Sequence, residues 1–323
     1  MDWKKKIFKN HSEQEFEDLA FEAFEYQMAY CEVYSSFVNS LRKKTPSNLQ
    51  EIPFLPISLF KTHKIISKEV PNTIDNVFMS SGTQGVRSSH FVKDVSIYEQ
   101  SFECGFKAFL GDPSELIVLA LLPNYIEQGD SSLVYMVNRL IEKTNSKHSR
   151  FILNDIEEIP DVIKTAKHEG KKLVLFGVAY SLMDLMDLNI SLKDCIVIET
   201  GGMKGRRKEL SKVDMYSQLK DKLQMGHLYS EYGMTELLSQ AYSMDDFTFL
   251  TPAWMKVLYR DISDPFTITN GVKGAGLNII DLSNIYSCSF IATDDLGLRK
   301  GNGFEILGRI QDSDIRGCNL LIE

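Results

Sequence analysis

The sequence lacks several features that would assign it to a familiar class of protein. No stretch reaches the roughly 18 consecutive apolar residues of a membrane span, and the first residues lack the apolar core of a secretory signal peptide. The five cysteines are odd in number, widely spaced and without a CxxC pair, which argues against a disulfide framework and a zinc knuckle. These absences favour a cytoplasmic protein with reduced thiols and no membrane span.

The chain also lacks an excess of positive charge. Its 323 residues include 36 Lys and Arg against 44 Asp and Glu, which gives a formal net charge of -8. A protein that binds the phosphate backbone normally carries a basic surface, so nucleic acid is not an expected partner. Hydrophobic residues make up 43% of the chain and charged residues 25%, a balance that is typical of a globular protein with a buried core.

Apolar periodicity predicts an α/β architecture. From Ser12 to about Leu41 the chain has neither proline nor glycine, and the spacing of its apolar residues predicts a helix capped by Ser12 and Glu15. Short apolar runs then alternate with helical patterns, as expected for buried, partly parallel strands between helices. The strand candidates are 76–81, 115–123, 150–154, 171–179, 194–202 and 225–233, and the helical patterns include 98–110, 131–143 and 158–169.

The pattern changes beyond residue 250. Closely spaced strand candidates without long helices follow, in the segments VLYRDIS, GLNIIDL, CSFIATDDLG and GFEILGRI. We therefore predict an α/β core with an N-terminal helical segment in residues 1–250, and a β-rich lobe with a truncated C-terminal tail in residues 251–323.

The segment SSGTQG, residues 80–85, is a candidate phosphate loop because it directly follows the apolar run 77–79. Glycines let the backbone turn sharply and present successive N–H groups, and Ser and Thr hydroxyls add further donors, so such a loop can wrap a polyphosphate. On chemistry alone, a serine-rich turn is an equally good interpretation. The segment lacks the Lys of a GxxxxGK[ST] loop.

The segment YGMTE, residues 232–236, adds groups that suit a nucleotide. A ring such as Tyr232 can stack on a base, and the hydroxyl of Thr235, at the start of the helix-like stretch 236–242, can bond a phosphate oxygen. The carboxylate of Glu236 can hold a magnesium ion. Alone this signal is weak, because many turns contain these residue types.

Three further segments complete the set. The glycines of ETGG, residues 199–202, could form one flat wall of a nucleotide slot or simply a tight turn. Asp295 is suited to accept hydrogen bonds from two ribose hydroxyls, and Arg309 to donate to ribose or phosphate.

The order of these pieces resembles the motif series of the adenylate-forming superfamily of acyl and aryl ligases. SSGTQG, ETGG, YGMTE, TDDLG and GRIQD stand in the order of that superfamily's SSGTTG, GG, YGxTE, TGDxG and GRxxD patterns. The resemblance covers most of the chain, and the short form, with IPFLPISLFKTHKI near its front, is most similar to the LuxE-type acyl-protein synthetases. It implies the fold of the N-terminal domain of adenylate-forming enzymes, with mixed and parallel sheets flanked by helices plus a β-rich lobe.

The resemblance also implies ATP and Mg²⁺ as cofactors and a role for each matching position. The phosphates would be held by Ser80, Ser81, Gly82, Thr83 and Gly85. Adenine, the acyl carbonyl and the ribose would be bound by Gly201, Gly202, Tyr232, Asp295 and Arg309. Thr235 would touch the adenylate phosphate, and Glu236 would ligate the magnesium ion.

Two departures from the family pattern concern the phosphate and ribose positions. Val86, Arg87 and Ser88 stand where many ligases carry a Lys, which leaves the compensation of phosphate charge open. Asp294 replaces the usual Gly before the ribose Asp. The chain also ends soon after GRIQD, so the resemblance implies that the full C-terminal cap of longer ligases, with its catalytic Lys, is lacking.

Cys318 is the candidate acyl acceptor, since LuxE-type proteins carry an acylated cysteine near the C-terminus. A thiolate is a strong nucleophile even as a minor species. The alternative is a small apolar residue in a terminal strand. The other cysteines, at 31, 104, 195 and 288, lie in apolar helix or strand patterns and are expected to be structural.

The leading hypothesis is ATP-dependent activation of a carboxylic acid, expected to be a fatty acid, to an acyl-adenylate. Transfer to Cys318 and then to a partner protein, a reductase or a carrier, would follow. Two alternatives remain open: an acyltransferase acting on a hydroxyl, amine or thiol acceptor in a biosynthetic pathway, and a catalytically inactive subunit that binds a nucleotide or an acyl group.

Overall fold

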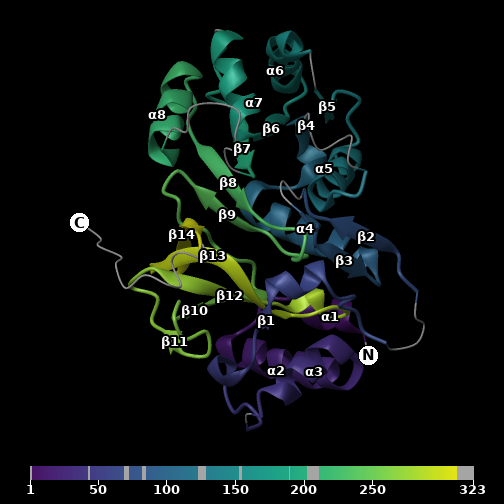
Figure 1. The fold of residues 1–323 in the computed structure, drawn as a ribbon. Helices are drawn as coiled ribbons and strands as arrows, with labels where there is room; N and C mark the ends of the chain where they lie inside the picture. Colours follow the sequence, from purple (N-terminus) through teal and green to yellow (C-terminus); the bar gives the residue numbers. More distant parts are fainter. Residues whose placement is uncertain are drawn as a thin grey trace. The chain divides into compact units, whose positions relative to one another are not determined.

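The computed structural model describes residues 2–42, 44–68, 73–81, 85–122, 129–152, 155–188, 190–201 and 211–310 (Figure 1). Its contacts divide the chain into two units. Unit 1 comprises residues 1–101, 235–239 and 250–323, and unit 2 comprises residues 102–234 and 240–249. The five residues 235–239, which include two residues of the YGMTE motif, therefore belong to a different unit from the residues on either side of them.

Helices and strands alternate as the sequence predicts. The α-helices are α1 (Trp3–Ile7), α2 (Glu13–Tyr30), α3 (Glu32–Ser40), α4 (Val95–Leu110), α5 (Ser132–Lys143), α6 (Ile159–His168), α7 (Ala179–Asp184) and α8 (Lys212–Lys222). The first nine strands are β1 (Leu55–Pro56), β2 (Asn76–Met79), β3 (Ser89–Val92), β4 (Leu116–Leu121), β5 (Arg150–Phe151), β6 (Lys172–Val178), β7 (Ile196–Thr200), β8 (Leu228–Tyr232) and β9 (Ala241–Met244). The remaining strands are β10 (Met255–Arg260), β11 (Ile268–Thr269), β12 (Ala275–Asp281), β13 (Phe290–Lys300) and β14 (Gly303–Arg309).

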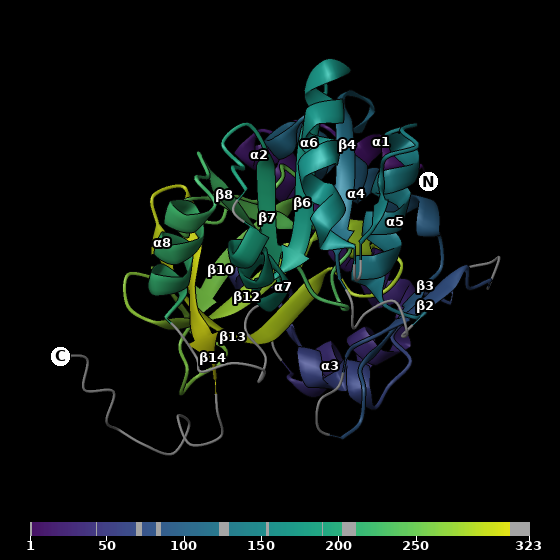
Figure 2. The ribbon, with the colours of Figure 1, turned by 90° about the horizontal axis from the view of Figure 1, so that it is seen from above.

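Unit 2 is built on a sheet with the strand order β5-β4-β6-β7-β8-β9. Figure 2 shows β4, β6 and β7 of this sheet side by side. The first five strands are parallel, and β9 returns antiparallel to β8. Every residue of β4 is buried, as expected for a strand covered on both faces, and this explains its continuous apolar sequence. Residues of α6, α7 and α8 share one hydrophobic core with the strands of the sheet, and α5 packs against β4.

Unit 1 contains a second sheet and a separate hairpin. The sheet has the order β1-β13-β12-β10-β11, with β14 also paired to β13, and β2 and β3 form the antiparallel hairpin. All described pairs of the larger sheet are antiparallel except β1 with β13. Helix α2 packs on this sheet through Phe24, whose ring centroid lies 6.3 Å from that of Phe290.

The predicted N-terminal helix is confirmed at its start and corrected near its middle. Ser12 and Glu15 form the predicted capping box, with Glu15 N–H donating to Ser12 Oγ at 3.3 Å and Ser12 N–H donating to Glu15 Oε2 at 2.8 Å. The helix does not run unbroken to Leu41, because Cys31 adopts an extended conformation (φ −101°, ψ 96°) and separates α2 from α3. No proline or glycine marks this break.

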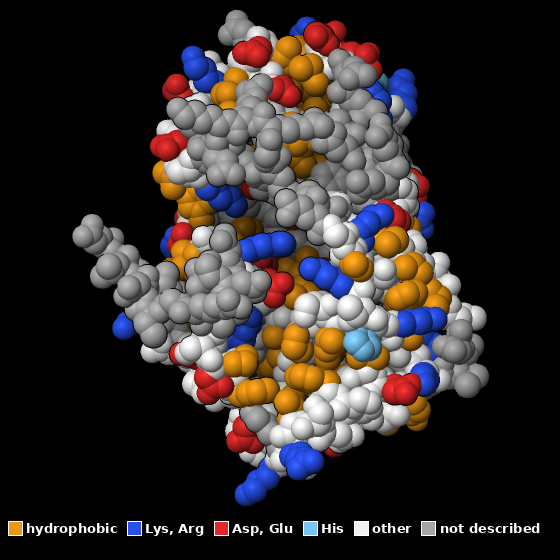
Figure 3. Space-filling view, viewed as in Figure 1, with side chains coloured by type: hydrophobic (Ala, Val, Ile, Leu, Met, Phe, Trp, Pro, Cys, Tyr) orange, Lys and Arg blue, Asp and Glu red, His pale blue; other side chains and the backbone are white. Residues whose placement is uncertain are grey.

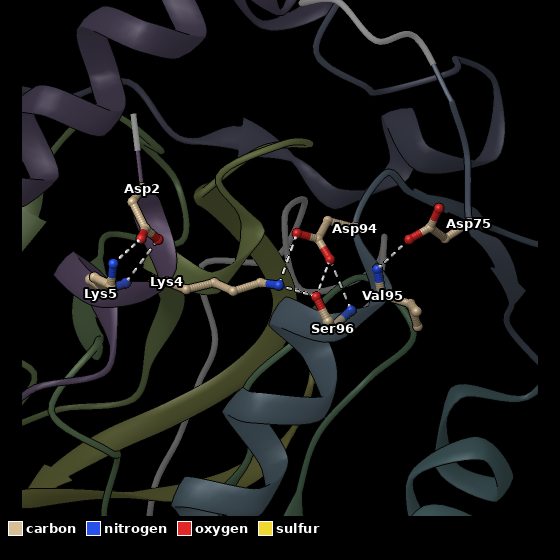
Figure 4. A network of polar contacts seen from close by, with 7 residues as sticks. All are labelled: Asp2, Lys4, Lys5, Asp75, Asp94, Val95 and Ser96. Carbon is tan, nitrogen blue, oxygen red and sulfur yellow. Dashed lines mark hydrogen bonds and ion pairs between the residues drawn. The ribbon is translucent and has the colours of Figure 1, made fainter.

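Two carboxylates cap the start of α4 (Figure 4). Val95 N–H donates to Asp75 Oδ2 at 3.1 Å, and Ser96 N–H donates to Asp94 Oδ1 at 3.0 Å. Lys4 of α1 forms an ion pair with Asp94 at 3.3 Å. Negative charge is favourable at a helix N-terminus, so this cluster stabilises α4 and ties the N-terminal helix to it.

The limits of the two units differ from the predicted domains 1–250 and 251–323, because residues before 102 pack with the strands that follow residue 250. That residues 1–250 and 251–323 form separate domains stays a prediction.

None of the helices in the described ranges has the length and apolar character needed to cross a membrane. On the face shown in Figure 3, Lys and Arg side chains are interspersed with Asp and Glu.

Candidate active site

The candidate phosphate loop joins the two strands of the β2–β3 hairpin. Ser80 N–H donates to Ser88 O at 3.0 Å, and Ser88 N–H donates to Ser80 Oγ at 2.9 Å, so these two residues close the base of the loop. Gly85 has φ +97°, a conformation that favours glycine. Ser80, Ser81 and Gly85 are described, whereas Gly82 and Thr83 lie outside the described residues.

Arg87 stabilises the backbone of this loop. Its Nε donates to the carbonyl oxygen of Ser80, and its second terminal nitrogen donates to that of Met79 at 3.4 Å. The guanidinium that stands near the usual Lys position therefore contacts the backbone of the hairpin itself.

Glu236 lies against the base of the loop. Its side chain is buried, with 6% of its surface exposed, and it is hydrogen-bonded to the side chain of Ser88. Burial raises the pKa of the Glu236 carboxyl, while the Ser88 hydrogen bond and the positive charges of Arg309 and Lys61 act in the opposite direction. A single carboxylate beside a phosphate loop is the arrangement with which Mg²⁺ is usually held, since phosphate oxygens and water complete its octahedron.

Arg309 acts on the same carboxyl from the β13–β14 hairpin, where it pairs with Asp295. The two residues are partners in the register of these strands, and Arg309 Nε lies 3.4 Å from Asp295 Oδ1. Asp295 is 7% exposed, whereas the Arg309 side chain is largely exposed. Unit 1 therefore brings together residues of four predicted motifs, through the loop base, Glu236 and the Asp295–Arg309 pair.

His90 on β3 holds the residue next to Glu236. Its Nδ1 lies 2.8 Å from the carbonyl oxygen of Thr235, and its Nε2 lies 2.8 Å from Ser287 Oγ. Because a carbonyl oxygen only accepts, Nδ1 carries the proton and Nε2 accepts from the Ser287 hydroxyl. Both ring nitrogens are thus hydrogen-bonded within the protein, and His90 is a structural histidine.

The stretch that follows Glu236 is not the predicted helix. Asp281 Oδ2 accepts from Leu238 N–H and Ser239 N–H, both at 2.9 Å, and its Oδ1 accepts from Ser239 Oγ at 2.6 Å. Asn284 donates from Nδ2 to the Glu236 carbonyl at 2.7 Å and accepts from Leu238 N–H at 3.1 Å. These buried side chains take the backbone groups that a helix would need, and the chain then continues into β9.

We expect His90 to make stability depend on pH. Burial lowers its pKa from 6.5 to about 4, so the unfolded chain binds a proton below pH 6.5 that the folded protein excludes until about pH 4. Stability should therefore fall as the pH drops through this window, and the His90 contribution should lose about 2 kcal/mol between pH 7.5 and pH 5.

Urea unfolding of wild type and His90→Gln at both pH values measures this contribution. Gln keeps a donor for the Thr235 carbonyl but does not titrate. Glu236 and Asp281 titrate in both proteins, so the difference between the two pH dependences isolates His90. Equal pH dependences would show that His90 is not the group responsible.

Gly201 follows β7, and Tyr232 is the last residue of the neighbouring parallel strand β8. Thr200 and Glu231 are the last register partners of β7 and β8, so the residue after each lies at the same edge of the sheet. Gly201 has φ +78°, which favours glycine, and the Tyr232 ring centroid lies 5.8 Å from that of Phe249. Gly202 lies outside the described residues.

Two acids, the buried Glu199 and the partly buried Glu231, accompany these residues. Glu199 Oε2 accepts from Ser230 Oγ at 2.8 Å and lies 3.5 Å from Lys212 Nζ. Glu231 accepts from the Thr200 hydroxyl. Burial raises the pKa of Glu231 to about 7, the Thr200 hydrogen bond opposes this shift, and the charge of Glu199 adds to it.

With this geometry in view, the family of the chain can be established. The family model of the LuxE acyl-protein synthetases matches residues 2–323. The chain belongs to the LuxE acyl-protein synthetase family. The predicted family is thereby confirmed, and with it the class of acid-activating ligases.

Solved structures show the same fold as this LuxE family member. A 2-hydroxyisobutyryl-CoA ligase superposes with a TM-score of 0.68 at 10% identity, covering 93% of this chain and 70% of the other. MatB from Rhodopseudomonas palustris gives 0.54 at 15% identity, with 74% and 48% covered, and McyG A-PCP with phenylalanyl-adenylate gives 0.54 at 15%, with 84% and 44%. The chain thus spans between 44% and 70% of the length of these proteins, and it has the predicted α/β fold of adenylate-forming enzymes. No curated protein sequence matches it.

Lys61 of this LuxE family member, the last residue of a 3-10 helix, Ile57–Lys61, belongs to none of the predicted motifs. The neighbouring Phe60 is buried, and its ring centroid lies 5.6 Å from that of His90, which places this helix beside the Glu236 segment. The exposed Lys61 ammonium acts on the Glu236 carboxyl. The available signal was its position within IPFLPISLFKTHKI, the segment that resembles the LuxE-type front.

Within the described ranges, no group of three or more His, Cys, Asp or Glu side chains is arranged to hold a metal ion. Cys318 lies outside the described residues. Its role as the acyl acceptor therefore stays a prediction.

Proposed function

We propose that this chain activates a carboxylic acid with ATP and transfers the acyl group through Cys318 to a partner protein. A carboxylate oxygen attacks the α-phosphorus of ATP, the bond to pyrophosphate breaks, and an acyl-adenylate forms. The Cys318 thiolate then attacks the acyl carbonyl, AMP leaves, and a thioester remains for the acceptor.

The convergence of the loop base, Glu236 and the Asp295–Arg309 pair carries this proposal. Ser88 bonds both Ser80 and Glu236, and Arg309 acts on Glu236 while it contacts Asp295. These residues come from three distant parts of the chain, and their types suit a triphosphate, a cation and a ribose. A serine-rich turn with no ligand would not require this combination.

The residues present can reduce the repulsion between a carboxylate and the α-phosphate. Positive charge from Arg309 and Lys61 supplies part of the compensation that Arg87, engaged with the loop backbone, does not. Magnesium bound at Glu236 would neutralise phosphate charge. Thr235, positioned by His90, would donate from its hydroxyl to the adenylate phosphate.

The adenine and the acyl carbonyl are assigned to residues of unit 2, and the phosphates to residues of the loop. We propose that Tyr232 stacks on adenine beside Gly201 and Gly202, and that Gly82 and Thr83 bind phosphate with Ser80, Ser81 and Gly85. The 2-hydroxyisobutyryl-CoA ligase and McyG structures carry acyl-adenylates, which supports the same intermediate here. A fatty acid as substrate, a reductase or carrier as acceptor, and a cytoplasmic location stay predictions.

Carboxylate-dependent exchange of labelled pyrophosphate into ATP tests the proposed function. Exchange that requires both an acid and Mg²⁺ supports adenylation. ATP binding without exchange would favour the inactive binding subunit. Transfer of an acyl group from a preformed thioester, without any ATP requirement, would favour the acyltransferase.

Replacing Asp295 by Asn should weaken ATP binding. The substitution removes the charge that pairs with Arg309 and weakens the acceptor for the ribose hydroxyls, so we expect the KM for ATP in the exchange reaction to rise roughly tenfold. The KM for the acid should change little. Asp264→Asn on an exposed turn of unit 1 is the control, and an unchanged KM for ATP in Asp295→Asn would remove the ribose assignment.

A further inference from the structure

Residues 235–239, which include Glu236, form a largely buried segment with neither helix nor strand. Buried backbone N–H and C=O groups need hydrogen-bond partners, and a segment outside a helix or sheet has to find them among side chains or water. Here His90, Asp281 and Asn284 supply such partners, and all three belong to unit 1, as the segment itself does. Side chains from distant parts of the sequence therefore set the course of the backbone at Glu236.

Asn284 binds this segment on both sides of Leu237. Its Nδ2 donates to the carbonyl oxygen of Glu236 at 2.7 Å, and its Oδ1 accepts from Leu238 N–H at 3.1 Å. A backbone carbonyl only accepts and a backbone N–H only donates, so the two partners fix the orientation of the amide. Asn284 is fully buried, and this single side chain holds the backbone where it leaves Glu236.

Asn284 is itself held by its surroundings. It ends a 3-10 helix, Leu282–Asn284, and its carbonyl oxygen accepts from Gln27 Nε2 at 3.2 Å and from Ser287 N–H at 2.9 Å. Its Nδ2 donates to the carbonyl oxygen of Cys288 at 3.2 Å as well. A side chain that is fixed by its neighbours can position another group accurately, and Asn284 meets this condition.

The Glu236 side chain is held at its other end by its hydrogen bond with Ser88. Mg²⁺ requires a near-ideal octahedron of oxygen ligands at about 2.0–2.1 Å, so a carboxylate that ligates it needs a fixed position. A misplacement of about 1 Å can lower a rate by about 100-fold. Asn284 restrains the backbone of Glu236, and Ser88 restrains its carboxyl.

We propose that Asn284 is a positioning residue of the adenylation reaction and acts through Glu236. The inference rests on the proposed function, in which the Glu236 carboxylate binds magnesium beside the phosphate loop. Asn284 acts on the backbone of Glu236 and not on the substrates. Its loss should therefore weaken the use of the metal and leave recognition of the acid unchanged.

Asn284→Leu tests the proposal, because leucine has the same branched shape but neither a donor nor an acceptor. Asn284→Ala is the second variant and avoids any crowding by the leucine methyl groups. Tyr34→Phe is the matched control, since Tyr34 is equally buried in unit 1 and loses only its hydrogen bond to the Pro53 carbonyl oxygen at 2.8 Å. All three variants should have a lower Tm, so each is measured at a temperature well below its own transition.

The first measurement is ATP binding by calorimetry without the acid, in Mg²⁺ and in EDTA. We expect Mg²⁺ to tighten ATP binding by the wild type and by Tyr34→Phe roughly tenfold or more, and by the Asn284 variants roughly twofold or less. This readout does not depend on catalysis. Equal gains in all four proteins would overturn the inference.

The second measurement is pyrophosphate exchange. The Asn284 variants should need roughly tenfold more Mg²⁺ for half of their maximal rate, while the KM for the acid stays within about twofold of wild type. In the Glu236→Gln background, Asn284→Leu should lower exchange by less than about twofold further, because the group that it positions is already gone.

The outcomes separate this inference from the proposed function. Asn284 variants that only lower the Tm, as Tyr34→Phe does, would show a structural role and overturn the inference while adenylation stands. A full multiplicative loss in the double variant would also overturn it, since Asn284 would then act independently of Glu236. Absence of exchange in the wild type with every acid would contradict the proposed function, and the inference with it.

Discussion

Glu236→Gln is expected to reduce carboxylate-dependent pyrophosphate exchange by about 100-fold or more, because the charge that holds magnesium against the phosphates is lost. Gln can retain the hydrogen bond with Ser88. The substitution also removes an ionisable group from a buried position where burial raises its pKa, so the fold should be at least as stable as wild type. The loss is therefore expected in the rate, with an unchanged or higher Tm.

The magnesium dependence makes this experiment specific. Exchange is measured from micromolar to tens of millimolar Mg²⁺, and the variant should need far more metal for half its maximal rate. Glu305→Gln is the control, since Glu305 forms a partly exposed ion pair with Lys300 at 3.4 Å. Near-wild-type exchange and metal dependence in Glu236→Gln would reduce the YGMTE match to a structural coincidence.

Local sequence patterns predict most of the strands. The apolar runs 115–123 and 171–179 correspond to β4 and β6, whose side chains are nearly all buried. Such strands can be predicted from the sequence because a parallel sheet covered on both faces requires strands of continuous apolar sequence. The capping box at Ser12 is equally local, since its two hydrogen bonds join residues three apart.

Contacts between distant residues set the features that the sequence does not predict. The stretch after Glu236 has a helical pattern, yet Asp281 and Asn284 bind its backbone from more than 40 residues away. His90 lies 145 residues before Thr235 in the chain, and no local pattern pairs them. The extended conformation of Cys31 is not predicted either, because neither proline nor glycine interrupts the helical pattern there.

Some residues of the candidate site can be predicted from the sequence, and others cannot. Motif order identifies Glu236, Asp295 and Arg309, and the structure brings these residues together in unit 1. Lys61 belongs to no motif and is recognised only through its position near Glu236.

The four cysteines that the structure describes are poor candidates for the acyl acceptor. Burial raises the pKa of Cys31 and of Cys288, and burial with the charge of Asp194 raises that of Cys195 to about 11. Cys104 is half-buried, and burial with the charge of Glu103 raises its pKa as well. A thiol with a raised pKa forms little thiolate at neutral pH, so these four are poor nucleophiles.

Cys318→Ser should therefore lose the covalent label that a radioactive acid and ATP leave on the wild-type protein, while pyrophosphate exchange stays within about twofold, because a serine hydroxyl at its ordinary pKa is a far poorer nucleophile than a thiolate. Hydroxylamine should release the wild-type label, as expected for a thioester. Cys104→Ser is the matched control and should keep both the label and exchange, since Cys104 is the least buried of the four described thiols. A label that persists in Cys318→Ser and disappears in Cys104→Ser would move the acceptor to residue 104. Exchange without any label in the wild type would remove the acyl-enzyme step and favour direct transfer from the adenylate to the acceptor.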